Sequence, residues 1–211
     1  MKYLVTITML VFLLTCREAN AQFIRSYGLS IGRVNSNQSW LYISGTGSDF
    51  HNRWGYTVGV FLEVVDLPFI SLVGEARYLQ NGFRLSIPYT TESNPDGPLG
   101  YEDFDPREDY ISTAVLLRVR FLTSVITPYL IAGPRLDVII FRDQQGFNAV
   151  IDEFHATNFG ATLGAGVDFH VFSPLGIFAE FRYNPDFTDS FNNGFLAVKN
   201  ESVSYLIGMR L

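Results

Sequence analysis

The sequence predicts an all-β fold in which eight antiparallel, up-and-down strands close into a transmembrane β-barrel. Three observations support this prediction. Apolar residues alternate with small or polar residues in eight segments, the connections alternate between long and short, and the strand charges gather on one face. A closed barrel of this size has an OmpA/OmpX-like architecture, whose interior is only wide enough for its own side chains.

The composition is that of a folded β-protein. The chain has 211 residues, of which 47% are hydrophobic and 17% are charged, a balance that argues against disorder. Aromatic residues make up 15%, an enrichment that suits strands and membrane interfaces. The formal net charge of -6 gives no general reason to bind nucleic acid.

The first segment has the layout of a secretory signal peptide. Lys2 is followed by an apolar run over 3–14, and a small-x-small cleavage site stands at 19–21. This apolar run is shorter than the roughly 20 residues that a transmembrane helix needs. We therefore predict a cleaved signal peptide over 1–21 and one outer-membrane β-barrel domain over 22–211.

A lipoprotein signal that ends at Cys16 is the competing interpretation of this segment. A small residue normally precedes a lipidated cysteine, and Thr15 fits that position poorly. Because Cys16 is the only cysteine, its removal leaves a mature chain without a disulfide or a cysteine metal site.

The alternation of residues is clearest over 158–171. Its apolar members are Phe159, Ala161, Leu163, Ala165, Val167, Phe169 and Val171, and its small or polar members are Asn158, Gly160, Thr162, Gly164, Gly166, Asp168 and His170. The same period of two predicts strands over 25–33, 54–65, 69–81, 110–121, 128–141, 177–184 and 202–211. Each segment is near the roughly 9–11 residues of a tilted membrane strand.

The connections follow the asymmetry of an outer-membrane barrel. Short turns are predicted near 66–68, 122–127 and 173–176. Long external loops are predicted over 34–53, 82–109, 142–157 and 185–201.

With few exceptions, the charges of the predicted strands fall on the face that would line the lumen. Exposure of such a charge to lipid would cost roughly 2–4 kcal/mol for arginine at mid-membrane. The lumen set is Glu63, Glu75, Arg77, Arg118, Arg120, Arg135, Asp137, Asp168, Glu180, Arg182 and Arg210. We predict that these carboxylates and guanidiniums form a structural network, because buried charges must be paired. The alternative is a gated ion path or a proton site.

Aromatic residues near the strand ends are candidates for the two interface belts of a membrane barrel. They are Tyr56, Tyr78, Phe121, Phe169 and Tyr183. Ordinary sheet packing is the alternative explanation for these residues.

Several sequence runs resemble the porin-family outer-membrane β-barrel domain of Bacteroidota, which is also described as PorT-like. The runs are FLEVVDLPFISLVGEARYLQNGF at 61–83, GATLGAGVDF at 160–169, FAEFRYNPDFTD at 178–189 and SYLIGMRL at 204–211. The resemblance implies an eight-stranded barrel in the outer membrane and says little about activity. The apolar terminal Leu211 is compatible with recognition by the barrel-assembly machinery, although proteobacterial barrels commonly end in phenylalanine.

The sequence contains no strong catalytic or metal-binding motif. His51, His155 and His170 lack the spacing of metal ligands, and no Gly-x-Ser-x-Gly elbow is present. The acidic loop over 92–109 could offer oxygen ligands to Ca²⁺, but it lacks EF-hand spacing, and a solvated loop is the preferred interpretation. We therefore predict that the protein is not an enzyme and needs no cofactor.

The predicted function is a structural or interaction role in the bacterial outer membrane, exerted through the external loops. The main alternative is a narrow passive porin or ion channel. Weaker alternatives are a secretion-machinery accessory barrel, a lipid-modifying barrel enzyme and a soluble lipocalin-like binder. The predicted partners are outer-membrane lipid and lipopolysaccharide, the barrel-assembly machinery during biogenesis and a protein partner at the external loops, with no role for nucleic acid.

Overall fold

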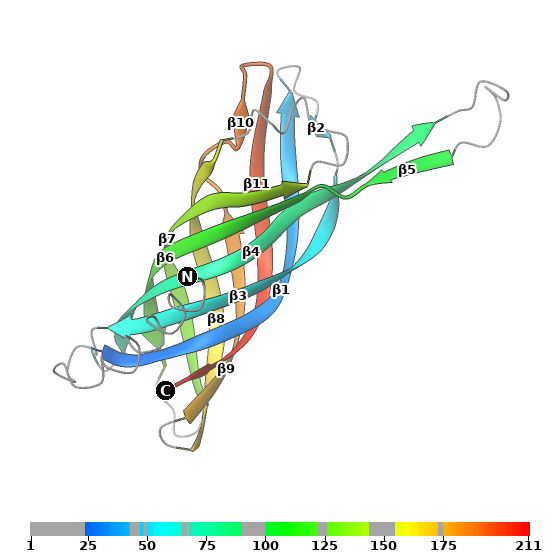
Figure 1. Ribbon diagram of the computed structural model, residues 1–211. Helices are drawn as coiled ribbons and strands as arrows, with labels where there is room; N and C mark the ends of the chain where they lie inside the picture. The colour runs from blue at the N-terminus through cyan, green and yellow to red at the C-terminus, as the bar shows by residue number, and fades with distance from the viewer. Residues whose placement is uncertain are drawn as a thin grey trace, which may run out of the picture.

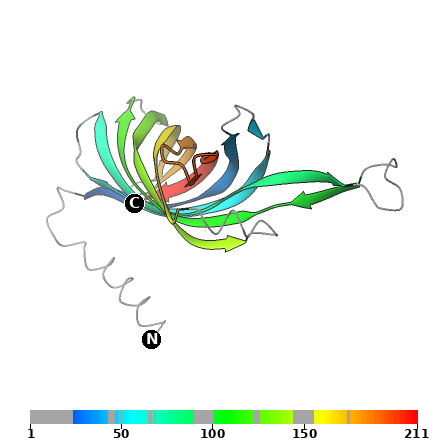
Figure 2. The ribbon, with the colours of Figure 1, turned by 90° about the horizontal axis from the view of Figure 1, so that it is seen from above.

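Eight long strands form a closed antiparallel ring in the computed structural model (Figures 1 and 2). The structure describes residues 24–42, 47–48, 50–64, 67, 69–89, 100–121, 126–143, 155–172 and 175–211. The strands of the ring are β1 (Ile24–Tyr42), β3 (His51–Val64), β4 (Ile70–Tyr89), β6 (Arg107–Arg120), β7 (Ile126–Asp143), β8 (Thr157–Phe172), β9 (Leu175–Pro185) and β11 (Leu196–Arg210). The all-β, up-and-down fold predicted from the sequence is confirmed.

The first and last strands of the chain close the ring. β1 pairs with β11 in a register that runs from Gly28 opposite Arg210 to Tyr42 opposite Leu196. On its other side β1 pairs with β3, and every further strand of the ring pairs with the next strand of the ring along the chain. Closure removes the exposed strand edges that an open sheet would present.

The strands extend further than the alternation predicted. β1, β4 and β11 run into the predicted loops over 34–53, 82–109 and 185–201. These regions also hold the short strands β2 (Gly47–Ser48), β5 (Gly100–Phe104) and β10 (Phe191–Asn192). The loop prediction was wrong there because strand pairing continues above the membrane, where the outward face no longer needs to be apolar.

An arm of two strands projects from the extracellular end of the ring (Figures 1 and 2). β4 pairs with β6 as far as Gly82, and from Leu85 onward it pairs with β5 instead. Gly82 has a φ of 147°, and a side chain there would collide with the carbonyl group of Pro106. Glycine is thus required where the arm leaves the barrel.

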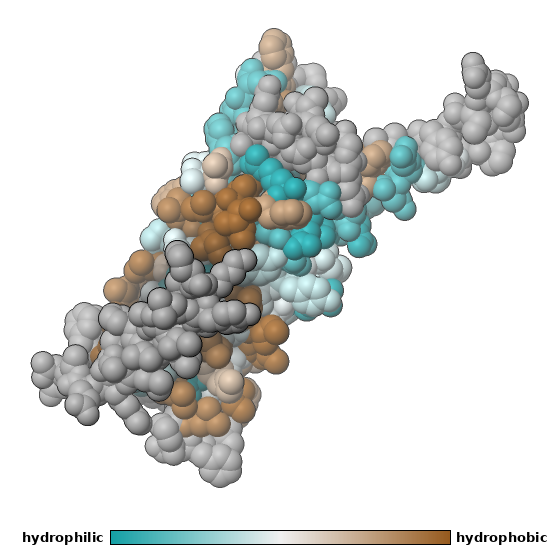
Figure 3. All heavy atoms as spheres, viewed as in Figure 1, coloured by the Kyte–Doolittle hydropathy of each residue, from teal (hydrophilic) through white to brown (hydrophobic). Residues whose placement is uncertain are grey.

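The outward face carries a broad apolar surface (Figure 3). Leu29, Val60 and Leu163 are 53%, 51% and 48% exposed, which is the expected arrangement when acyl chains surround the protein. This surface gives way to polar residues at Arg33 on β1 and Glu201 on β11, which also face outward. The described residues contain no helix that is long and apolar enough to cross a membrane.

Candidate functional site

The lumen of the barrel gathers the charged residues that the sequence singled out. All eleven predicted lumen residues face inward, and each of their side chains is at most 8% exposed. They come from every strand of the ring except β1. Strand alternation explains this placement, because residues two apart share a face.

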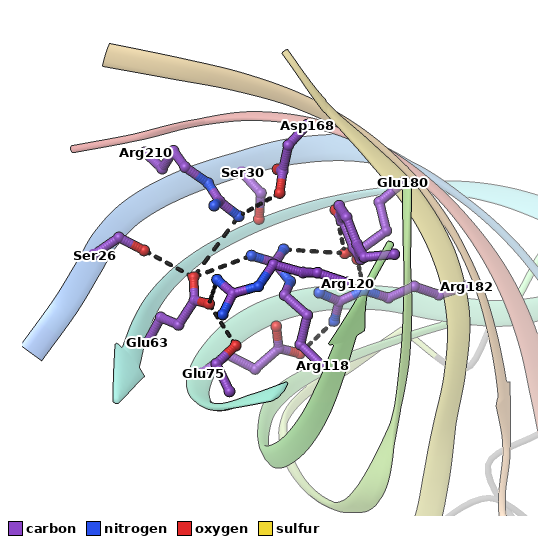
Figure 4. A network of polar contacts seen from close by, with 12 residues as sticks. Ser26, Ser30, Glu63, Glu75, Arg118, Arg120, Asp168, Glu180, Arg182 and Arg210 are labelled. Atoms are coloured by element: carbon purple, nitrogen blue, oxygen red, sulfur yellow. Dashed lines mark hydrogen bonds and ion pairs between the residues drawn. The ribbon is translucent and has the colours of Figure 1, made fainter. Parts of the chain in front are cut away.

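Glu63 is the centre of the periplasmic half of this network (Figure 4). Its side chain is fully buried, and its carboxylate lies 3.2 Å from Arg118 and 3.0 Å from Arg120. The hydroxyl groups of Ser26 and Ser71 also donate to it, the first at 2.9 Å. One carboxylate therefore accepts hydrogen bonds from four side chains that lie on three other strands.

The network continues from Glu63 along the lumen. Arg210 lies 3.7 Å from Glu63 and 3.0 Å from Asp168, and Arg118 lies 3.8 Å from Glu180. The Tyr129 hydroxyl donates to Glu180 at 2.8 Å, and the guanidinium of Arg118 lies 4.0 Å from the centre of the Tyr129 ring. The two signs of charge alternate along this path, so each guanidinium lies beside a carboxylate.

A second part of the same chain of contacts crosses the barrel. Arg182 on β9 pairs with Glu180 on its own strand and with Glu75 on β4 at 2.5 Å. Glu75 in turn lies 3.3 Å from Arg77, whose guanidinium donates to Ser30 at 3.5 Å. Since β4 and β9 are not neighbours in the ring, these contacts tie opposite walls together.

Arg135 and Asp137 form a separate cluster nearer the extracellular end. Arg135 lies 2.9 Å from Asp137 and 2.5 Å from Asp186. Asp186 was not among the predicted lumen residues, because it follows the end of β9 at Pro185 and was expected to lie in a loop. Asp186 lies an even number of residues from Glu180 and Arg182 and therefore shares their face of the strand, which is the signal that could have placed it in the lumen.

An apolar layer that the alternation did not predict interrupts the charged lumen. Phe61 on β3 and Phe178 on β9 meet edge to face with ring centroids 5.5 Å apart. β1 and β11 separate these two strands in the ring, so the rings reach across the interior. A side chain at Gly28 or Gly208 would collide with these rings, which explains glycine at both lumen positions.

A second apolar cluster fills the extracellular part of the lumen. Trp40, Phe50 and Phe83 pack with ring centroids 4.7 to 5.8 Å apart. Phe191 and Val198 complete the cluster, and all five residues are at most 9% exposed.

Two cavities in the lumen show how little space the side chains leave. One lies beside Phe61, Phe178 and Glu180, and the other lies between Glu75 and Arg135. Each has a volume of about 10 Å³, which is room for one water molecule.

The described residues do not assemble a metal site. No group of three or more histidine, cysteine or acidic side chains in the described part of the chain could hold a metal ion. His51 and His155 are exposed, and the side chain of His170 lies outside the described residues. Residues 1–21, which hold the predicted signal peptide, also lie outside them, so that segment stays a prediction.

The described acidic residues near the arm contact other protein groups. Asp105 lies 3.0 Å from Arg53 and 3.3 Å from Arg84. Ser86 donates to Asp103 at 2.5 Å. Glu92 and Asp96 of the predicted acidic loop lie outside the described residues, so the preference for a solvated loop over a calcium site stays a prediction.

The predicted belt aromatics all face outward, in two groups. Tyr56, Tyr78 and Tyr183 lie in the extracellular halves of the membrane-facing segments, and Phe121 and Phe169 lie near the periplasmic ends of β6 and β8. This separation matches the two interfaces of a bilayer.

The fold and the lumen define a membrane-spanning β-barrel whose interior is occupied by its own side chains. The chain belongs to the family of the outer membrane protein beta-barrel domain, whose model matches residues 22–192. It is therefore a protein of the bacterial outer membrane. No curated protein matches the sequence.

Three solved outer-membrane proteins are similar to this chain in structure at low sequence identity. Neisserial surface protein A is 14% identical with a TM-score of 0.53, and the match covers 89% of this chain and 98% of that protein. The outer membrane protease OmpT of Escherichia coli is 8% identical with a TM-score of 0.49, covering 92% and 98%. OprG of Pseudomonas aeruginosa is 11% identical with a TM-score of 0.48, covering 90% and 96%.

Proposed function

We propose that this barrel is a non-conducting outer-membrane protein that binds a protein partner through its β4–β5 arm. The observation that carries the proposal is the contrast between a closed interior and a projecting exterior. The Phe61–Phe178 contact and the aromatic cluster around Trp40 block the lumen at two levels. The arm lies outside this closed body and leads away from the ring (Figure 2).

The base of the arm is held firmly against the barrel. Asp105 accepts from Arg84 on β4 and forms an ion pair with Arg53 on β3, which brings three segments together. Leu85 packs against the aromatic cluster inside the barrel mouth. A rigid base lets the arm present Tyr101, which is 65% exposed, at a fixed position above the membrane.

Strand pairing is the mode of contact that the arm supports best. Within the described residues, β5 pairs with β4 alone, so one of its edges is open to a further strand. Main-chain hydrogen bonds to such an edge supply affinity, and alternate side chains supply specificity. The acidic residues Glu102 and Asp103 on β5 favour a partner strand with basic side chains.

Site-specific photo-crosslinking in intact cells tests this proposal. A photoreactive amino acid at Tyr101 is expected to form a discrete protein adduct. The same group at Phe195, which is 73% exposed near the β10–β11 turn, is the matched control and is expected to form none. Equal adducts at both positions, or none at Tyr101, would contradict a role for the arm.

Planar-bilayer recording tests the closed lumen independently. The purified mature protein is expected to give no steady conductance, because two apolar layers obstruct the path. A reproducible conductance that Phe61→Ala enlarges would favour the channel function instead.

Membership of the PorT-like branch is a further proposal that rests on the sequence runs named above. Removal of the protein from its native host, followed by assay of protein secretion, would test a place in the secretion machinery. Normal secretion would argue against that place and would leave the arm proposal intact.

A further inference from the structure

Two adjoining hollows lie on the outward face of the barrel, one near its extracellular boundary and the other extending from there toward the periplasmic ends of β6 and β7. The upper hollow has a volume of about 280 Å³, and its polar lining includes the amides of Asn35, Asn37 and Asn52. The lower hollow is a mainly apolar groove of about 760 Å³. Phe181 and Tyr205 line both hollows, so together they form one continuous surface, which we name the girdle groove.

The lower part of the girdle groove crosses the strands along one row of register partners. Arg33 on β1 lies opposite Tyr205 on β11, and Tyr205 lies opposite Phe181 on β9. The row continues through Ala165 on β8 to Leu130 on β7. The lining includes the small residues Gly32, Ala165, Gly166 and Ala179. Ala165 within the row and the other small residues beside it leave the space that an extended acyl chain needs.

Arg33 supplies a positive charge at the upper end of this apolar row. Its guanidinium carbon lies 4.7 Å from the centre of the Tyr56 ring and 5.5 Å from that of the Trp54 ring. Among the described residues, no carboxylate forms an ion pair with Arg33, whereas the lumen arginines are paired. An outward cation at the membrane boundary attracts an anionic lipid headgroup.

The polar part of the girdle groove offers the groups that recognise sugar hydroxyls. The amides of Asn35 and Asn52 present donors and acceptors beside the rings of Tyr183 and Tyr205. The carboxylate of Glu201 also lines this part and accepts from the Tyr183 hydroxyl at 3.1 Å. A carboxylate there accepts from hydroxyl groups but repels a phosphate, so the anionic group of a ligand would lie at Arg33.

We propose that the girdle groove binds one phosphorylated glycolipid of the outer leaflet. Its phosphate pairs with Arg33, its sugar occupies the polar part beside Asn35 and Glu201, and an acyl chain lies along the apolar row toward Leu130. The phosphates and the acyl chains of such a lipid are both attached to its sugars, so one ligand can contact the polar part, Arg33 and the apolar row together. The site is separate from the β4–β5 arm, so this inference stands or falls independently of the proposed partner.

Native mass spectrometry of the purified mature protein in detergent tests the site. The probe is bisphosphorylated lipid A, compared with dephosphorylated lipid A and with phosphatidylglycerol. Arg33→Gln removes the cation, and its matched control is Arg84→Gln, which removes an exposed arginine on the arm. Ala165→Phe fills the apolar row, and its matched control is Ala132→Phe, at an exposed alanine of β7 outside the groove.

The expected result is one retained molecule of bisphosphorylated lipid A on the unaltered protein. Arg33→Gln and removal of the phosphates are each expected to weaken binding about ten-fold, which is the scale of one charge-assisted hydrogen bond. Ala165→Phe is expected to weaken binding, and both controls are expected to leave it unchanged.

Three results would overturn the proposal. Unchanged affinity in Arg33→Gln would show that Arg33 does not bind the phosphate. Equal effects of the two phenylalanine substitutions would show that the acyl chain does not lie along the apolar row. Equal binding of phosphatidylglycerol would reduce the site to general attraction for anionic lipid. A shift in gel mobility on boiling, required of every variant, shows that each barrel has folded.

Discussion

Glu63→Gln should test whether the lumen network stabilises the barrel. The substitution keeps the shape of the side chain and removes a charge that faces Arg118, Arg120 and Arg210. Loss of one partner from a buried ion pair typically costs about 3–5 kcal/mol, because the other partner stays buried without compensation. Ser26 and Ser71 donate to different oxygens of Glu63, so in the variant one of them can donate to the amide oxygen while the other accepts from the amide nitrogen.

The remaining contacts of the three arginines set the size of this effect. Arg210 keeps Asp168 at 3.0 Å, and Arg120 keeps the carbonyl oxygen of Leu67 at 3.1 Å. Arg118 keeps Glu180 and the Tyr129 ring. Because each guanidinium retains a partner, we expect a loss of about 3–5 kcal/mol in total, as for a single pair.

Urea unfolding from lipid vesicles measures this loss. The fluorescence of Trp40 and Trp54 reports unfolding, because one is buried in the mouth and the other faces outward. Glu201→Gln is the matched control, since it removes an exposed carboxylate and should cost at most about 1 kcal/mol. If Glu63→Gln costs no more than this control, the network does not stabilise the fold and the reasoning is refuted.

Three further substitutions test other parts of the lumen. Glu75→Gln should lower the urea midpoint without creating a conductance; an altered conductance would favour an ion path. Gly208→Ala should destabilise the barrel by about 1–3 kcal/mol in the same assay, because its methyl group collides with the Phe178 ring, and an unchanged midpoint would contradict that packing. Beyond the membrane-spanning part of β9, burial raises the pKa of Asp186 to about 7 despite the nearby Arg135. The folded protein then binds this proton more tightly than the unfolded chain, so stability should fall as the pH rises through that value. Asp186→Asn should therefore make stability depend less on pH. Equal profiles of stability against pH for the variant and the unaltered protein would contradict the raised pKa of Asp186.

The sequence predicted the ring and the lumen charges because both follow from alternation. Lipid and lumen impose opposite demands on the two faces of each strand, so residue parity carries the information. The alternation of residues does not determine how far above the membrane the strand pairing continues. β1 therefore continues to Tyr42, far past the last predicted strand residue at 33. The arm was missed for the same reason, since Tyr101, Glu102 and Asp103 of β5 are exposed whichever way they face.

The apolar layers of the lumen were missed for a different reason. Phe61 and Phe178 occupy lumen-facing positions in the alternation. They were not predicted to line the lumen because lumen residues were expected to be small or polar. That rule describes wide, water-filled barrels, whereas eight strands leave only enough room for packed side chains. The outward position of Arg33 follows from the alternation. Its contacts with aromatic rings do not, because those rings belong to the neighbouring strand β3.

A filled lumen raises the question of why its charges are kept, since well-packed apolar residues often replace buried ion pairs without loss of stability. Transport to the outer membrane offers a physical reason. A strand that is apolar on both faces would give a continuous apolar run. A run of about 18 or more apolar residues is long enough to span a membrane as a helix. Charges such as Glu180 and Arg182 interrupt that run while the chain is unfolded, and they are neutralised by pairing once the barrel closes. On this reasoning the network reconciles passage of the unfolded chain through water with a folded state in the membrane.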